Sequence, residues 1–112
     1  MTKTILITGA GTGIGLHTAW ALAVRGHRVV ATTGDEPQAQ ALRAQAHAQG
    51  VAMEVFKLDI TSAADRQQIL GLELDVLINN AGIGESGSLA EVDVDRIRAV
   101  FEVNVFATLE LT

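Results

Sequence analysis

The stretch Thr8-Gly9-Ala10-Gly11-Thr12-Gly13-Ile14-Gly15 follows the apolar run Ile5-Leu6-Ile7 and precedes a helical pattern. Glycine suits such a connection physically. One glycine permits a tight turn, another lets the backbone approach a pyrophosphate, and a third lets the helix pack closely on the strand. The anion then lies at a helix N-terminus, where free N–H groups and the helix dipole favour it. The stretch predicts a dinucleotide-phosphate loop, and a structural turn without ligand is the alternative that the loop alone leaves open.

Length and composition predict one globular domain over residues 1–112. Hydrophobic residues make up 48% of the chain, with 11 glycines and one proline, which is not the composition of a disordered segment. The chain has no cysteine, which excludes disulfides, thiolate catalysis and cysteine-ligated metal sites. The three histidines are far apart and show no metal-ligand spacing, so we expect no metal.

The charge pattern argues against nucleic acid as a partner. The net charge is −5 and the eight Lys and Arg residues are scattered rather than clustered. No leader segment is recognised before the first strand, and no apolar run has the length of a membrane span. We therefore expect a cytoplasmic protein that binds neither nucleic acid nor membranes.

Short apolar runs alternate with amphipathic stretches, which is typical of βαβ units. Strands are predicted over 4–8, 28–32, 52–58 and 75–79. Helices are predicted over 13–25 (with Ile14, Thr18, Ala21 and Leu22 on one face), from Asp35 to about 50, in a short segment after Thr61 or Ser62, and from 94 to the end. The fold class is α/β: a Rossmann-type doubly wound parallel sheet of about four strands in the order 3-2-1-4, with flanking helices and incomplete at its C-terminal side.

Further motifs follow the glycine loop at suitable distances. They are Asp59-Ile60-Thr61, Asn79-Asn80-Ala81-Gly82 and Asn104-Val105-Phe106-Ala107. Together with the loop they make nearly the whole chain resemble the short-chain dehydrogenase/reductase family. The resemblance implies NAD or NADP as cofactor, hydride transfer between the nicotinamide and a small-molecule alcohol or carbonyl, and a homo-oligomer. The predicted cofactor-binding residues are Thr8, Gly9, Gly11, Thr12, Gly13, Ile14, Gly15, Thr33, Asp59, Ile60, Asn80, Ala81 and Gly82.

Polar residues at the ends of apolar segments have a physical interpretation beside the family one. Asp59 can accept a hydrogen bond from an adenine amine, as the resemblance implies, or cap the turn at Thr61 and Ser62. Asn79 and Asn80 follow an apolar strand, so we expect their amides to pair with neighbouring backbone, although a simple strand-ending turn fits as well.

Asn104 falls within the apolar stripe Ile97, Val100, Phe101, Thr108 and Leu111 of the last predicted helix. A polar side chain there requires a partner, and a backbone-satisfied core asparagine is one interpretation. The resemblance implies the other, a catalytic residue that holds a water molecule in the proton relay to a lysine.

The choice between NAD and NADP is predicted to be made at Thr33, where strand two delivers side chains to the adenosine ribose. NAD-selective members of the family generally carry an acidic residue at this position, whereas NADP-selective members often have Arg at the position of Gly34 or a basic residue at that of Thr12. None of these is present. The missing carboxylate slightly favours NADP, and Asp35 is an alternative ribose partner.

The family's serine, tyrosine and lysine are not recognised in the chain, which contains no tyrosine at all. We therefore expect the 112 residues to form the cofactor-binding half of an oxidoreductase and to be inactive alone. A non-catalytic NAD(P)-binding module is the alternative, and a Tyr-x-x-x-Lys motif encoded after Thr112 would distinguish the two.

Overall fold

A computed structural model of the chain describes residues 1–84, 86–88 and 90–112. Its centre is a parallel sheet of the strands β1 (Thr4–Ile7), β2 (Arg28–Thr33), β3 (Glu54–Lys57) and β4 (Val76–Ile78). The strand order is β3-β2-β1-β4, as the sequence predicts. Ile7 of β1 lies opposite Ala31 on one side and Ile78 on the other, so the carboxyl ends of these strands share one edge of the sheet.

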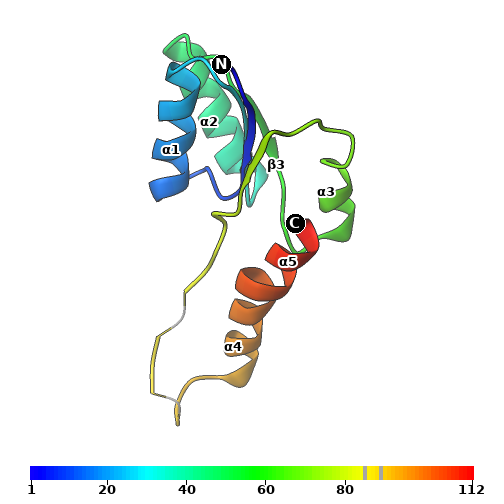
Figure 1. The fold of residues 1–112 in the computed structure, drawn as a ribbon. Coiled ribbons are helices and arrows are strands. Elements are labelled where there is room, and N and C mark those ends of the chain that lie inside the picture. The colour runs from blue at the N-terminus through cyan, green and yellow to red at the C-terminus, as the bar shows by residue number, and fades with distance from the viewer. Residues whose placement is uncertain (85, 89) are drawn as a thin grey trace.

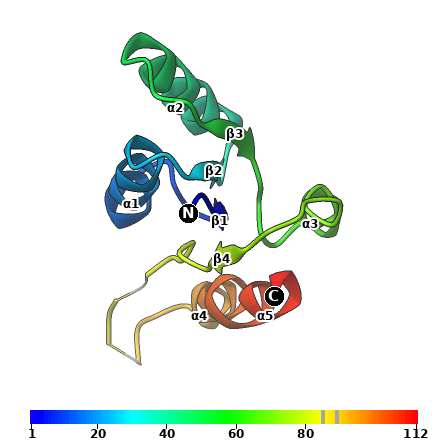
Figure 2. The ribbon, with the colours of Figure 1, turned by 45° about the horizontal axis from the view of Figure 1, so that its top comes forward.

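Helices cover both faces of the sheet, as Figures 1 and 2 show. The helices α1 (Gly13–Val24) and α2 (Glu36–Ala48) lie on one face. The short helix α3 (Ala63–Gln67) lies on the other, together with a continuous helical segment made of α4 (Val94–Phe101), η1 (Glu102–Ala107) and α5 (Thr108–Leu111). This is the doubly wound arrangement predicted from the alternating pattern.

Consecutive residues of the central strands point into two separate cores. Leu6 and Val30 pack with residues of the α3 side, whereas Ile7 and Val29 pack with residues of α1 and α2. All four side chains are at most 1% exposed. The apolar runs therefore follow from burial on both faces, because successive side chains of a strand alternate between them.

The predicted inward face of the first helix is partly wrong. Gly15 and Ala19 are its buried residues, whereas Ile14 is 81% exposed and Ala21 is exposed as well. Hydrophobicity has almost no periodicity along α1, so the sequence pattern could not select the face. The small residues Gly15 and Ala19 are buried between α1 and the sheet, and Leu16, Trp20 and Leu22 pack partly buried against the same core.

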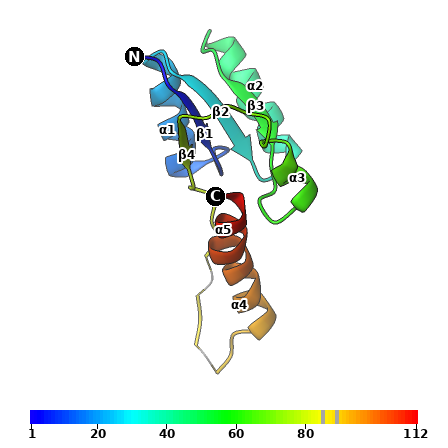
Figure 3. The same cartoon turned by 45° about the vertical axis from the view of Figure 1, so that its right-hand side comes forward.

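The predicted last helix is present, but a π-helical turn, η1, interrupts its α-helical pattern. Ala107 is buried, and Ile97, Val100, Thr108 and Leu111 are half-buried, as predicted. Phe101, which the stripe places inside, is 53% exposed. In Figure 3 the α4 end of the segment extends away from the sheet, and Phe101 is the last residue of α4.

Candidate dinucleotide-binding site

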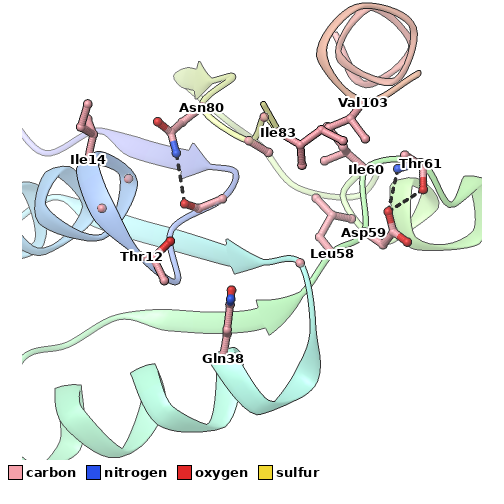
Figure 4. Close-up of a pocket in the computed structure, with 16 residues that line it drawn as sticks. Thr12, Ile14, Gln38, Leu58, Asp59, Ile60, Thr61, Asn80, Ile83 and Val103 are labelled. Carbon is pink, nitrogen blue, oxygen red and sulfur yellow. Dashed lines mark hydrogen bonds between the residues drawn. The ribbon is translucent and has the colours of Figure 1, made fainter. Parts of the chain in front are cut away.

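A cleft of ≈ 530 Å³ opens where the glycine loop leaves β1. Its walls come from the loop, from the segments that follow β2, β3 and β4, and from η1 (Figure 4). The residues predicted from the sequence that line it are Gly9, Thr12, Gly13, Ile14, Gly15, Asp59, Ile60, Asn80, Ala81 and Gly82. The cleft therefore lies at the carboxyl edge of the sheet. Its position is next to β1, which has β2 and β3 on one side and β4 on the other. Open α/β sheets bind ligands at this position.

Two glycines of the loop are required by close approach of other backbone segments. A Cβ atom on Gly9, whose φ is 64°, would lie 2.8 Å from Ala81 Cα. A Cβ on Gly15 would lie 2.4 Å from the carbonyl oxygen of Gly9 and 2.3 Å from Asn80 Nδ2. Any side chain here would separate α1 from β1 and the loop from the segment after β4.

The first turn of α1 faces the cleft without a capping side chain. Thr12 occupies the N-cap position but makes no side-chain hydrogen bond to the helix, whereas α2, α3 and α4 are capped by Asp35, Ser62 and Asp93. The N-terminal N–H groups of a helix have no partner within the helix, and they carry the positive end of its dipole. Gly13 has a φ of 58°, and a Cβ atom placed on it would meet no described atom within 4 Å, so an anion can approach the backbone there.

Thr8 and Asn80 fasten the ends of β1 and β4 together. The Thr8 hydroxyl accepts hydrogen bonds from the backbone N–H groups of Asn80 at 3.1 Å and Ala81 at 3.0 Å. In return, Asn80 Nδ2 donates to the carbonyl oxygens of Thr8 at 3.0 Å and Gly9 at 3.1 Å. Thr8 is 1% exposed and does not line the cleft. Asn80 pairs with backbone as expected, but Asn79 instead donates to the Thr112 hydroxyl at 3.0 Å.

Asp59 both caps the turn after β3 and faces the cleft. Its Oδ1 accepts from the backbone N–H of Thr61 at 2.9 Å and from the Thr61 hydroxyl at 2.6 Å. Its Oδ2 has no hydrogen-bond partner within the described part of the chain. The two interpretations of Asp59 are therefore compatible, because one oxygen holds the turn while the other is available to a donor in the cleft.

Asp65 holds the backbone of Asp59 in place through a hydrogen bond to its N–H. Its Oδ2 accepts from the Asp59 N–H at 2.8 Å and lies 2.7 Å from Lys57 Nζ. The hydrogen bond from Lys57 and the one from the Asp59 backbone lower the pKa of Asp65, and the Asp65 carboxylate raises the pKa of Lys57. Asp65 is thus a buried carboxylate whose ionised form is stabilised by its neighbours.

Asn104 lies in η1 and binds the segment after β4. Its Oδ1 accepts from the N–H of Ile83 at 2.9 Å, and its Nδ2 donates to the Ile83 carbonyl at 2.7 Å. The residue is exposed rather than embedded in the apolar stripe, and it pairs with backbone. A Cβ on Gly82 would lie 3.2 Å from Asn104 Oδ1, so the amide packs directly behind the wall of the cleft.

The structure does not bring Gly11 or Thr33 into the lining of the cleft. Thr33 is 0% exposed, and its hydroxyl donates to the carbonyl oxygen of Asp35 at 2.7 Å. The Asp35 carboxylate accepts from the backbone N–H of Gln38 at 2.8 Å. Both groups considered as ribose partners are therefore engaged in starting α2.

Several lining residues were not predicted from the sequence. They are Gly34, Gln38, Leu58, Thr61, Ile83 and Val103. Gln38 is three residues after the helix-capping Asp35, in the helical turn directly after β2, and this position could have identified it. Val103 reaches the cleft only because the helical segment containing η1 lies beside the loop after β4, a contact that local sequence patterns do not encode.

Comparison with known proteins establishes the family. Residues 3–112 match the family model described as short chain dehydrogenase. An "Uncharacterized oxidoreductase" of Myxococcus xanthus is 39% identical over 109 residues, which cover 92% of this chain and 43% of the relative. Human "Retinol dehydrogenase 8" is 37% identical over 116 residues, covering 97% of this chain and 37% of the relative. The chain belongs to the short-chain dehydrogenase family.

Solved structures share the fold of this chain as well. A short-chain dehydrogenase from Sphingobium yanoikuyae in complex with NADPH superimposes with a TM-score of 0.82 at 34% identity. The match covers 97% of this chain and 45% of that structure. The chain thus spans less than half the length of these relatives. Within the described residues, no helix is long and apolar enough to cross a bilayer, and no three carboxylate or imidazole groups are placed to hold a metal ion.

Proposed function

We propose that the chain is the dinucleotide-binding half of an NAD(P)-dependent oxidoreductase, with the pyrophosphate at the N-terminus of α1. The observation that carries this proposal is the uncapped first turn of α1 above Gly13, which opens into the cleft. Free N–H groups there offer hydrogen bonds to phosphate oxygens without an intervening side chain.

The far end of the cleft suits an adenine ring. Leu58 and Ile60, both buried, provide apolar contact, and Oδ2 of Asp59 is available to accept a hydrogen bond from the exocyclic amine. On the opposite side, Ala81 and Gly82 leave room for the nicotinamide ribose. The remaining predicted cofactor-binding residues, Thr8 among them, hold these walls in place.

When bound, the nicotinamide accepts or supplies a hydride, and we propose an alcohol or a carbonyl as its reaction partner. Asn104 is the residue of this chain that we assign to catalysis. It fixes the loop at Ile83 through both atoms of its amide, and the family resemblance adds that it holds a water molecule in the proton relay.

We propose that NAD and NADP are both accepted, with a slight preference for NADP. Gly34 and Gln38, the described lining residues that follow β2, carry no carboxylate, and the position that is acidic in NAD-selective relatives is the buried Thr33. The structurally similar enzyme from Sphingobium yanoikuyae was solved in complex with NADPH, which supports the proposed preference for NADP.

Three further expectations stay proposals. The chain alone has no turnover, because proton transfer needs groups that its 112 residues do not supply. It forms a homo-oligomer, and we propose that Phe101, Phe106 and Leu109, which are exposed on the helical segment, take part in the contact. It acts in the cytoplasm. Light scattering after size-exclusion chromatography, with Phe106→Ser as the comparison, tests the proposed homo-oligomer.

Titration calorimetry of the folded chain with ADP-ribose, NADH and NADPH tests the proposed function. ADP-ribose contains the adenine and pyrophosphate that the described cleft accommodates, so we expect saturable binding of all three. Nicotinamide mononucleotide, which lacks the adenosine half, is expected to bind much more weakly. If a chain with native circular dichroism binds none of the adenine-containing compounds at millimolar concentration, the proposal fails.

A further inference from the structure

Gln38 projects from the first turn of α2 into the cleft. A Cβ atom on Gly11 would lie 2.3 Å from Gln38 Oε1 and 3.1 Å from Gln38 Cβ, so the side chain lies directly against the glycine loop. In Figure 4 it stands between Thr12 of that loop and the turn that carries Asp59. In the proposed function these two ends hold pyrophosphate and adenine, and the adenosine ribose connects them.

The carboxamide of Gln38 has no hydrogen-bond partner within residues 1–84, 86–88 and 90–112, although the side chain is half-buried. Its backbone N–H donates to the Asp35 carboxylate at 2.8 Å. The unpaired amide atoms are therefore accessible to a ligand in the cleft, to which an amide offers two donors and an acceptor. Its unused capacity is directed at the cleft.

The part of the cleft lining next to Gln38 is uncharged, and the nearest carboxylate, that of Asp35, lies outside the lining and accepts the Gln38 backbone N–H at 2.8 Å. Gly34, the neighbouring lining residue at the end of β2, contributes no side chain and has no atom within 4 Å of a Cβ position. Of the described residues that line the cleft, only Asp59 carries a charge. Thr33 is buried and engaged. A substituent on the ribose in this region therefore meets a neutral carboxamide and open space.

We propose that Gln38 contacts the 2′ position of the adenosine ribose and makes the site tolerant of both a hydroxyl and a phosphate there. This inference rests on the proposed dinucleotide function. The amide nitrogen donates to a phosphate oxygen, and either amide atom pairs with a hydroxyl. Because the group is neutral, it neither repels a 2′-phosphate nor neutralises it, so NADH and NADPH bind with dissociation constants within about tenfold of each other.

Charge substitutions at residue 38 test the inference. We expect Gln38→Glu to shift the affinity ratio about tenfold toward NADH, because a carboxylate repels the 2′-phosphate, and Gln38→Lys to shift it about tenfold toward NADPH. Gln40→Glu and Gln40→Lys are the matched controls. Gln40 is exposed on the same helix and lies outside the lining, so these variants carry the same charge change and should leave the ratio within about twofold.

The measurement is the dissociation constant of each dinucleotide by fluorescence or calorimetry, with circular dichroism to confirm folding. The inference is overturned if the unmodified chain binds both dinucleotides and neither Gln38 variant changes their ratio. It is overturned equally if the Gln40 variants change the ratio as much, or if the unmodified chain discriminates more than about thirtyfold. Failure of the unmodified chain to bind either dinucleotide instead refutes the proposed function on which the inference rests.

Discussion

Asn104 and Ile83 are joined by two hydrogen bonds that use both atoms of the asparagine amide, at 2.9 Å and 2.7 Å. This pair connects the π-helical turn η1 to the segment after β4, which forms one wall of the cleft. π-helical turns occur frequently at functional sites. Here the turn contains the one residue of the chain that we assign to catalysis.

Asn104→Ala is expected to loosen this wall. Each hydrogen bond contributes on the order of 0.5–1.5 kcal/mol, so the unfolding free energy should fall by about 1–3 kcal/mol, and amide exchange at Ile83 should accelerate. Asn79→Ala is the control, because the Asn79 amide donates to the Thr112 hydroxyl and Asn79 is outside the described lining of the cleft. Equal exchange rates at Ile83 in the two variants would contradict the assigned role.

Gly13→Leu is expected to abolish dinucleotide binding, because a side chain there occupies the space above the α1 N-terminus. Gly13 has φ 58° and open surroundings, so the substitution costs only the strain of a left-handed residue, about 1–2 kcal/mol. Gly50→Leu is matched to it, with φ 67°, open surroundings and a position outside the cleft. Calorimetry should show lost binding in the first variant and unchanged affinity in the second. Equal affinities would remove the glycine loop from the proposed site.

The strands could be predicted from local signals, whereas the strand order and most of the cleft lining were predicted from the motifs that resemble the short-chain dehydrogenase family. Buried parallel strands are continuous apolar runs, and the loop after β1 must contain glycine where Gly9 meets Ala81. The orientation of side chains at the edges is not local. The pattern alone did not show that Thr33 turns inward to the Asp35 carbonyl while Gln38 turns into the cleft, since both depend on how α2 packs after β2.

Thr33→Asp illustrates the difference. The sequence alone predicts a switch toward NAD by repulsion of a 2′-phosphate. In the structure the Thr33 hydroxyl donates to the Asp35 carbonyl at 0% exposure, and a carboxylate cannot donate there. We expect a loss of about 1–3 kcal/mol in unfolding free energy and little change in the NADH to NADPH affinity ratio. Gly34→Asp, which places the same group in open space on the cleft, should shift that ratio toward NADH. A larger shift from Thr33→Asp would show that Thr33 contacts the ribose.

Asp65 is expected to make stability depend on acid pH. Its pKa is lowered in the folded state by Lys57 and by the Asp59 N–H, so its contribution is present above the ordinary value of 3.8 and is lost as pH falls through the folded value. The pKa of Lys57 is raised in the folded state, so the contribution of Lys57 to stability is present at neutral pH and is lost as pH rises above 10.5. Urea unfolding of the chain and of Asp65→Asn should differ by on the order of 1–2 kcal/mol at neutral pH and converge below pH 3.8. A constant difference down to the most acid condition would contradict the ion pair.

The 112-residue chain is expected to bind dinucleotide without catalysing hydride transfer. The amide of Asn104 does not titrate near neutral pH, and the chain contains no tyrosine or cysteine that could act as proton donor. Both amide atoms of Asn104 are also engaged in hydrogen bonds with the backbone of Ile83. Absorbance at about 340 nm with NADH or NADPH and a panel of alcohols, ketones and aldehydes should stay at background, while calorimetry on the same preparation shows binding. Turnover by the purified, mass-verified chain that disappears in Gly13→Leu would show that a second copy completes the active site or that these residues contain a proton donor of another kind.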